Sequence, residues 1–143
     1  MDLTRYTRRP AHEVRIGGVV IGGNQPIAVQ SMTNTSTNDT AGSVAQIERI
    51  DRAGGKIVRL TAQGRREGEN LKQIVEGVRA DGYQTAIVAD IHFVPEVAAI
   101  AANYVDKVHA PLLWRRPRGE DKPAPGLHLA PRRCCRPMVH GQL

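Results

Sequence analysis

Cysteine is scarce in this sequence, which holds only two, Cys134 and Cys135, among its 143 residues. Two adjacent cysteines exclude a framework of several disulfides, and they give neither the Cys-x-x-Cys spacing nor the paired histidines of a zinc site. No stretch approaches the roughly 18 apolar residues that cross a membrane, and residues 1–6 lack the apolar segment of a secretion signal. We therefore expect a cytoplasmic protein with no membrane span and no metal site built on cysteine.

Aromatic residues are also scarce, and the positive charge is spread unevenly along the chain. The net charge is +6, but residues 1–108 hold 13 Lys and Arg against 12 Asp and Glu, whereas residues 109–143 hold 7 against 2. Among the arginines of this second part the only aromatic residue is Trp114, so platforms for stacked bases are missing. We therefore expect no nucleic-acid partner, and we divide the chain into a domain, residues 1–108, and a tail, residues 109–143.

Residues 1–108 alternate between strand-like and helix-like patterns. Two short apolar segments around Gly17 and Gly18 predict a β-hairpin, because glycine takes the positive φ that a tight turn requires. Apolar runs then begin near residues 27, 56, 85 and 105, and helical periodicity follows the first three. The helices are expected at about residues 39–53, 69–80 and 95–102, the first of them capped by Asn38 or Asp39.

A series of strand-helix units predicts a parallel sheet with right-handed crossovers. Such a series begins both a closed (β/α)8 barrel and an open doubly wound sheet. The barrel is favoured because each strand ends in polar residues, and in a barrel the carboxyl ends of the strands surround one opening. We therefore expect an α/β fold: the N-terminal portion of a (β/α)8 TIM barrel, preceded by a short β-hairpin and followed by an aperiodic tail.

The third predicted parallel strand is the most informative, because its apolar run ends in Asp90 and, two residues later, His92. Residues i and i+2 of a strand share a face, so the carboxylate and the imidazole can point the same way. On the preceding strand, Arg59 lies between two apolar neighbours and needs an ion-pair partner or an anion such as phosphate. Two plainer alternatives stay open here: Asp90 as a helix cap and Arg59 as a structural ion-pair member.

Three motifs occur in order within residues 10–108: Ile-Ala-Val-Gln-Ser-Met-Thr-Asn-Thr at 27–35, Ile-Val-Arg-Leu at 57–60 and Val-Ala-Asp-Ile-His-Phe at 88–93. Any one of them alone is a weak signal. Together, and at these intervals, they resemble the N-terminal part of the 4-hydroxy-3-methylbut-2-en-1-yl diphosphate synthase family.

The resemblance implies an iron-sulfur oxidoreductase of isoprenoid (terpenoid) biosynthesis by the non-mevalonate pathway. The family reductively opens the ring of 2-C-methyl-D-erythritol 2,4-cyclodiphosphate with two electrons from flavodoxin or ferredoxin. A [4Fe-4S] cluster, held by three cysteines and a glutamate in a C-terminal domain, delivers these electrons to substrate bound in a TIM barrel. Members of the family are generally homodimers.

The resemblance also implies roles for residues of this sequence. Arg59 would bind the diphosphate, and Asp90 and His92 would line the substrate pocket as catalytic residues. The segment at the end of the first parallel strand would form part of the barrel mouth and bind substrate: Ser31, Met32, Thr33 and Asn34. The resemblance assigns no metal ligand to this chain.

Two other functions stay open at this point. A pterin-binding barrel of the dihydropteroate synthase type also has an opening strand that ends in Asn- and Thr-rich sequence, and tight binding of a pterin would favour it. A non-catalytic protein could instead bind a polyanion through the basic tail, with an affinity that falls steeply as salt rises.

The resemblance ends after Val108, where the family continues with Arg-Ile-Asn-Pro-Gly-Asn and this sequence reads His-Ala-Pro-Leu-Leu-Trp. We therefore expect residues 109–143 to be out-of-frame or disordered sequence. Three strand-helix units and part of a fourth strand cannot close a barrel, so an apolar edge that pairs or aggregates is expected. Cys134 and Cys135 cannot replace three spaced thiolates, so we expect this chain to bind no cluster and to turn over no substrate by itself.

A shift of reading frame in the encoding gene would account for so abrupt a change. We predict that translating the DNA after codon 108 in the other frames yields Arg-Ile-Asn-Pro-Gly. Sequencing the gene is the measurement. If no frame contains that motif, a diverged or alternative terminus is the explanation instead.

Overall fold

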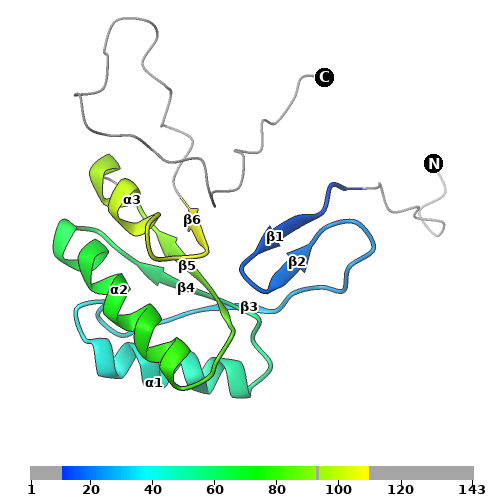
Figure 1. The fold of residues 1–143 in the computed structure, drawn as a ribbon, viewed down its shortest axis with the longest axis horizontal. Helices are drawn as coiled ribbons and strands as arrows, with labels where there is room; N and C mark the ends of the chain where they lie inside the picture. The colour runs from blue at the N-terminus through cyan, green and yellow to red at the C-terminus, as the bar shows by residue number, and fades with distance from the viewer. Residues whose placement is uncertain (1–10, 93, 110–143) are drawn as a thin grey trace, which may run out of the picture.

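The computed structural model describes residues 11–92 and 94–109, in which helices pack on one face of a parallel sheet (Figure 1). The elements in chain order are β1 (Val14–Ile16), β2 (Val19–Ile21), β3 (Gln30–Met32), α1 (Thr40–Arg52), β4 (Ile57–Thr61), α2 (Arg65–Ala80), β5 (Ala86–Asp90), α3 (Pro95–Ala101) and β6 (Lys107–His109). The antiparallel pair β1–β2 precedes a four-stranded parallel sheet with the order β3–β4–β5–β6. The predicted hairpin and the predicted succession of strands and helices are confirmed.

The register of the parallel strands determines which side chains share a face. β4 and β5 pair with Arg59 beside Val88 and with Thr61 beside Asp90. β5 and β6 pair with Asp90 beside His109. Because side chains alternate between the two faces of a strand, these five residues lie on one face of the sheet, and the residues between them lie on the other.

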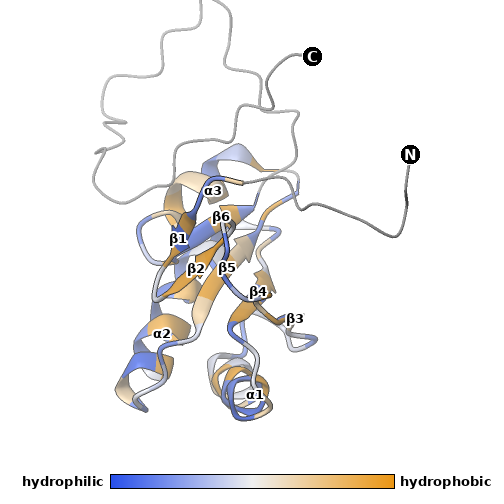
Figure 2. Cartoon of the chain, turned by 90° about the vertical axis from the view of Figure 1, so that its right-hand side faces the viewer, coloured by the Kyte–Doolittle hydropathy of each residue, from blue (hydrophilic) through white to orange (hydrophobic). Residues whose placement is uncertain are grey.

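The main hydrophobic core lies between that other face and the helices. Its fully buried members come from β4, β5 and all three helices, and they include Ile47, Val58, Leu60, Leu71, Ile74, Val78, Ile87, Ala89, Val97 and Ala101. Figure 2 shows β4 and β5 as largely hydrophobic strands. Burial of apolar surface stabilises a fold by about 25 cal/mol per Å², so this core holds the helices on the sheet.

A second, smaller core joins the hairpin to the face that carries Arg59. Ile16 is 1% exposed and packs with Ile57, Ala86 and Val88. Ile57 and Ala86 are the first residues of β4 and β5, so the hairpin covers the amino-terminal end of the sheet. Figure 1 shows the hairpin on the side of the sheet away from α1 and α2.

Capping interactions set the helix boundaries. Of the two predicted caps, Asn38 and Asp39, it is Asp39 that caps α1: its Oδ1 accepts a hydrogen bond of 3.0 Å from the Gly42 N–H. Helix α2 begins at Arg65, earlier than the apolar periodicity predicts. The reason is Glu67, whose carboxylate accepts a hydrogen bond of 3.1 Å from the Gly64 N–H and so closes an additional first turn.

The first parallel strand differs from the prediction. The sequence predicts a buried strand over residues 27–32, but β3 is only three residues long and all of them are exposed. Just before it, Ile27 and Val29 are 88% and 57% exposed. Within the described residues β3 pairs with β4 alone and is an edge strand, so apolar residues that suit a central strand contact solvent here.

Part of the predicted organisation lies outside the described residues. This applies to residues 110–143 of the tail, including Cys134 and Cys135, whereas His109, the first tail residue, ends β6. The division at residue 108 therefore stays a prediction. Across residues 11–92 and 94–109, the structure has no helix with the length and apolar character of a membrane span.

The apolar edge at β3 predicts self-association of the chain. We expect Ile27→Lys combined with Val29→Lys to raise the monomer fraction, because charged side chains at a sheet edge oppose pairing with another edge. Sedimentation velocity over a concentration series measures the fraction.

A control for this variant carries the same charge change on the helices: Ala45→Lys combined with Gln73→Lys, both at exposed positions. We expect this pair to leave the self-association near that of the wild type. An equal rise in monomer for both pairs would attribute the effect to net charge and contradict the role of the edge.

Candidate functional site

The carboxyl-terminal end of the parallel sheet holds an ion pair between β4 and β5. Arg59 Nη2 lies 2.5 Å from Asp90 Oδ2. Arg59 stands two residues before Thr61, the register partner of Asp90, so the long guanidinium side chain reaches the end of the neighbouring strand. The N-cap of α3 is Val94, which excludes the alternative of Asp90 as the cap of that helix.

Burial distinguishes this ion pair from a surface contact. The side chain of Asp90 is 3% exposed and that of Arg59 is 22% exposed. Within the described residues, three buried side-chain atoms have no hydrogen-bond partner: Thr33 Oγ1, Arg59 Nε and Asp90 Oδ1. Leaving such an atom unsatisfied costs about 1–3 kcal/mol, so a ligand that satisfies these atoms would recover free energy.

His92 extends the site toward solvent. Its Nδ1 lies 3.9 Å from Asp90 Oδ1, and its side chain is 48% exposed. This distance is too long for a hydrogen bond, and the contact is an ion pair only when the imidazole is protonated. The structure brings the acid and the imidazole to the same end of β5, as their spacing predicts.

Two of the predicted substrate-binding residues lie beside Arg59 in the chain fold: Met32, which ends β3, and Thr33, which follows it. Met32 pairs with Arg59 in the parallel register and is 43% exposed. The Thr33 N–H donates a hydrogen bond of 3.0 Å to the backbone oxygen of Arg59. Met32 therefore shares the face of the ion pair, whereas Thr33 is joined to the Arg59 backbone and its side chain makes no hydrogen bond with the ion pair.

The other two predicted residues of that segment are not brought to Arg59. Ser31 pairs with Val58, whose side chain lies in the core beneath the helices, so the alternation of a strand takes Ser31 to the opposite face. Asn34 is exposed, and its N–H donates a hydrogen bond of 3.1 Å to Gln46 Oε1.

Two residues of β6 that sequence reasoning missed share the face of the ion pair. Lys107 pairs with Val88, the register partner of Arg59, and His109 pairs with Asp90. Lys107 and His109 are two residues apart, and residues at this spacing in a strand share a face. Without the register between strands, this spacing could not show which face they occupy.

The arrangement can bind a ligand that carries both acceptor and donor groups. A guanidinium group donates well to phosphate and carboxylate oxygens, and the buried Arg59 Nε–H has no hydrogen-bond partner among the described residues. Among the same residues no donor reaches Asp90 Oδ1, and this acceptor suits a hydroxyl group. A hydroxylated phosphate ester supplies both chemistries.

The described residues do not fit a thiolate-bound cluster. Among them, no group of three or more His, Cys, Asp or Glu side chains could hold a metal ion. Both cysteines of the chain fall in the part that the structure does not describe, and iron-sulfur clusters are bound mainly by cysteine thiolates.

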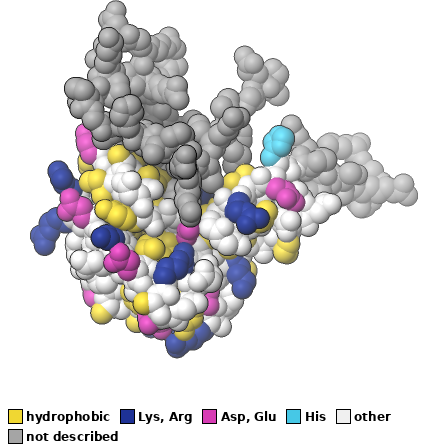
Figure 3. Space-filling view, viewed as in Figure 1, with side chains coloured by type: hydrophobic (Ala, Val, Ile, Leu, Met, Phe, Trp, Pro, Cys, Tyr) yellow, Lys and Arg dark blue, Asp and Glu magenta, His cyan; other side chains and the backbone are white. Residues whose placement is uncertain are grey.

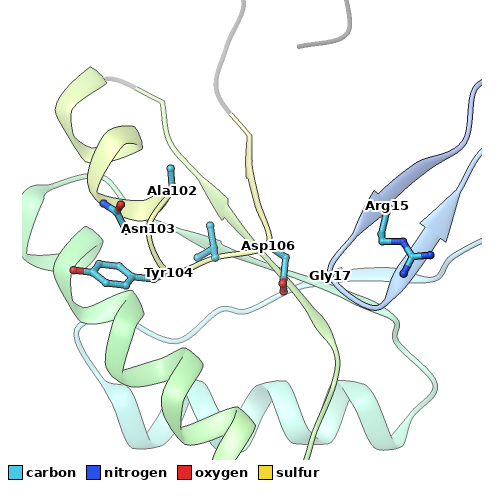
Figure 4. A pocket seen from close by; sticks show the side chains of 7 residues that line it. Arg15, Gly17, Ala102, Asn103, Tyr104 and Asp106 are labelled. Carbon is cyan, nitrogen blue, oxygen red and sulfur yellow. The ribbon is translucent and has the colours of Figure 1, made fainter. Parts of the chain in front are cut away.

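A surface depression lies at the other end of the sheet, between the hairpin and residues 102–106 (Figure 4). Asp106 there accepts hydrogen bonds of 3.0 Å from Arg79 and 2.9 Å from the Ile87 N–H. A Cβ on Gly17, which has a φ of 56°, would lie 2.7 Å from the Asp106 carboxylate. At this depression the hairpin packs closely against Asp106. The depression lies away from the Arg59–Asp90 ion pair.

Comparison with known proteins finds matches over the same part of the chain. The family model described as "GcpE TIM-barrel domain" matches residues 11–110. The chain is 57% identical over 108 residues to the "4-hydroxy-3-methylbut-2-en-1-yl diphosphate synthase (flavodoxin)" of Phocaeicola vulgatus, which covers 76% of this chain and 18% of that protein. A protein with the same name from Bacteroides thetaiotaomicron is 56% identical over 108 residues, which cover 76% of this chain and 18% of that protein. Another, from Leptospira interrogans, is 48% identical over 103 residues, which cover 72% of this chain and 16% of that protein.

The chain thus spans less than a fifth of the length of these relatives. Its matched residues include the hairpin, the parallel sheet, the helices and the Arg59–Asp90 ion pair. The predicted resemblance and the predicted partial TIM barrel are both confirmed, and the chain belongs to the GcpE TIM-barrel domain family.

Proposed function

We propose that this chain provides part of the substrate-binding barrel of a 4-hydroxy-3-methylbut-2-en-1-yl diphosphate synthase. In this role it binds 2-C-methyl-D-erythritol 2,4-cyclodiphosphate, the substrate of the family's step in non-mevalonate isoprenoid biosynthesis. The observation that carries the proposal is the buried Arg59–Asp90 ion pair at the carboxyl end of a parallel sheet of this family. TIM-barrel enzymes bind their substrates at that end of the strands.

Each side chain has a role that its contacts support. Arg59 donates hydrogen bonds to a phosphate oxygen of the substrate, because its Nε–H has no partner in the described residues. Asp90 accepts a hydrogen bond from a substrate hydroxyl through its unpartnered Oδ1. His92 and Thr33 contact substrate oxygens at the rim, and Met32 contacts the carbon skeleton.

The remaining parts of the activity are proposed for a full-length protein. Flavodoxin, which the relatives' names contain, or ferredoxin would donate the electrons, and a [4Fe-4S] cluster would supply the electron-transfer chemistry in a cytoplasmic homodimer. The described residues do not fit such a cluster. Their contribution is to bind and orient the cyclic diphosphate.

Neither alternative function gains support from the described residues. The family match gives no reason to expect a pterin. The face of the molecule in Figure 3 mixes Lys and Arg with Asp and Glu, and ion pairs such as Arg65–Glu69 at 2.8 Å contribute to this mixture. A mixed surface of this kind does not attract a polyanion strongly, but the polyanion alternative depends on the basic tail, which apart from His109 lies outside the described residues.

We expect Arg59→Gln to weaken binding of inorganic pyrophosphate to this chain by about tenfold or more, since hydrogen bonds to charged groups contribute roughly 1.5–3 kcal/mol. Isothermal titration calorimetry at low ionic strength is the measurement. Arg66→Gln is the matched control, because it removes the same charge from an exposed position on α2. If both variants bind pyrophosphate equally weakly, the loss of affinity comes from the change in net charge, and the proposal is contradicted.

A second variant separates binding from folding. Arg59→Gln alone leaves the Asp90 carboxylate buried without its partner, which costs about 3–5 kcal/mol in comparable sites. The double variant Arg59→Gln with Asp90→Asn removes both charges and is expected to unfold closer to the wild-type temperature. If the double variant regains wild-type pyrophosphate binding, Arg59 is not the phosphate ligand.

We expect anaerobic reconstitution of the 143-residue chain with iron and sulfide to leave no bound cluster. Its two cysteines are adjacent, and a cluster needs more thiolates, spaced to reach it. Visible absorbance and iron content after desalting are the measurements, with the Phocaeicola vulgatus relative treated in parallel as the positive control. One cluster per chain would overturn this expectation.

A further inference from the structure

The loop between β3 and α1, residues 33–39, is fixed by side chains of both neighbouring helices. From α1, Gln46 Oε1 accepts hydrogen bonds of 3.1 Å from the Asn34 N–H and 3.2 Å from the Thr35 N–H. The fully buried Ser43 adds a second contact from the same helix, since its Oγ lies 3.0 Å from Thr35 Oγ1.

Helix α2 holds the same loop from the other side. Asn70 Nδ2 donates a hydrogen bond of 2.7 Å to the backbone oxygen of Thr37 and one of 3.0 Å to Thr40 Oγ1. Thr37 is 4% exposed, and its Oγ1 donates a hydrogen bond of 2.6 Å to the backbone oxygen of Thr61. Thr61 ends β4, so the loop is tied to the strand that carries Arg59.

These contacts decide what the loop can offer to a ligand. Backbone N–H groups of a loop often bind phosphate, but those of Asn34 and Thr35 are directed to Gln46 Oε1. The loop can therefore offer side chains to a ligand, but not these two N–H groups. Thr33 Oγ1 has no hydrogen-bond partner in the described residues, and Asn34 is exposed.

We propose that Gln46 and Asn70 are positioning residues of the substrate site, which hold in place, before substrate binds, the loop that Thr33 joins to the Arg59 backbone. The proposal rests on the proposed function. Neither residue contacts the ion pair, so they act through the loop. A loop fixed in advance loses less conformational freedom on binding, and this increases affinity without a new contact.

The first experiment needs no ligand. Amide hydrogen exchange of Asn34 and Thr35, followed by NMR in the 143-residue chain, should accelerate about tenfold in Gln46→Leu, which corresponds to the loss of a hydrogen bond. Gln46→Glu keeps an acceptor oxygen and should restore slow exchange. Gln73→Leu is the matched control for an exposed helical glutamine and should exchange like the wild type.

The second experiment measures the affinity of the same chains for inorganic pyrophosphate by titration calorimetry. We expect Gln46→Leu and Asn70→Leu each to bind several-fold more weakly than Gln73→Leu, with thermal unfolding temperatures recorded to exclude global unfolding. Gln46→Glu is left out of this comparison because it adds a negative charge near the anion. Weakening from both helices would support the proposal.

Three results would overturn it, and they can be told apart. Unchanged exchange in Gln46→Leu would show that Gln46 does not hold the loop. Faster exchange with unchanged pyrophosphate affinity would show that the loop is held but does not serve the site, and the proposed function would survive. Absence of pyrophosphate binding by the wild-type chain would remove the proposed function and this inference together.

Discussion

Strands β4 and β5 pair in parallel with Thr61 beside Asp90, and the arrangement at the carboxyl end of the sheet depends on this register. It brings Arg59 to Asp90 on one face, while Leu60 and Ala89 lie on the other face in the core beneath the helices. A slip of one residue would exchange the two faces. The hydrophobic core therefore constrains the geometry of the ion pair, because a slip of one residue would expose the core and bury the charges beneath the helices.

The ion pair itself contributes little to stability. Taking two charges out of water costs several kcal/mol per ion, and their attraction repays this only when further hydrogen bonds satisfy the remaining polar atoms. In the described residues Arg59 Nε and Asp90 Oδ1 have no such bonds. Proteins keep unsatisfied polar groups of this kind mainly at functional sites, where a ligand supplies the missing partners.

Local features of this chain could be read from its sequence, and features that depend on register could not. The Asp39 cap and the shared end of Asp90 and His92 follow from neighbouring residues, and the structure contains both. The contact between Arg59 and Asp90 joins residues 31 positions apart, so it needed the pairing of two strands. The exposure of Val29 escaped prediction because an apolar run does not reveal whether its strand lies at an edge.

The charge balance at the open end of the sheet limits what this chain can bind alone. Arg59 and Asp90 cancel each other, and Lys107 adds a cation on the same face. His109 stands in register with Asp90, where the family resemblance leads one to expect an arginine, and an imidazole lacks the forked donors and the permanent charge of a guanidinium group. A diphosphate carries several negative charges, so high affinity requires cations from further strands around a complete barrel. Under the proposed function, the described sheet contributes one acid for a substrate hydroxyl, Asp90, and one phosphate ligand, Arg59, so the remaining cations would have to come from the rest of a complete barrel.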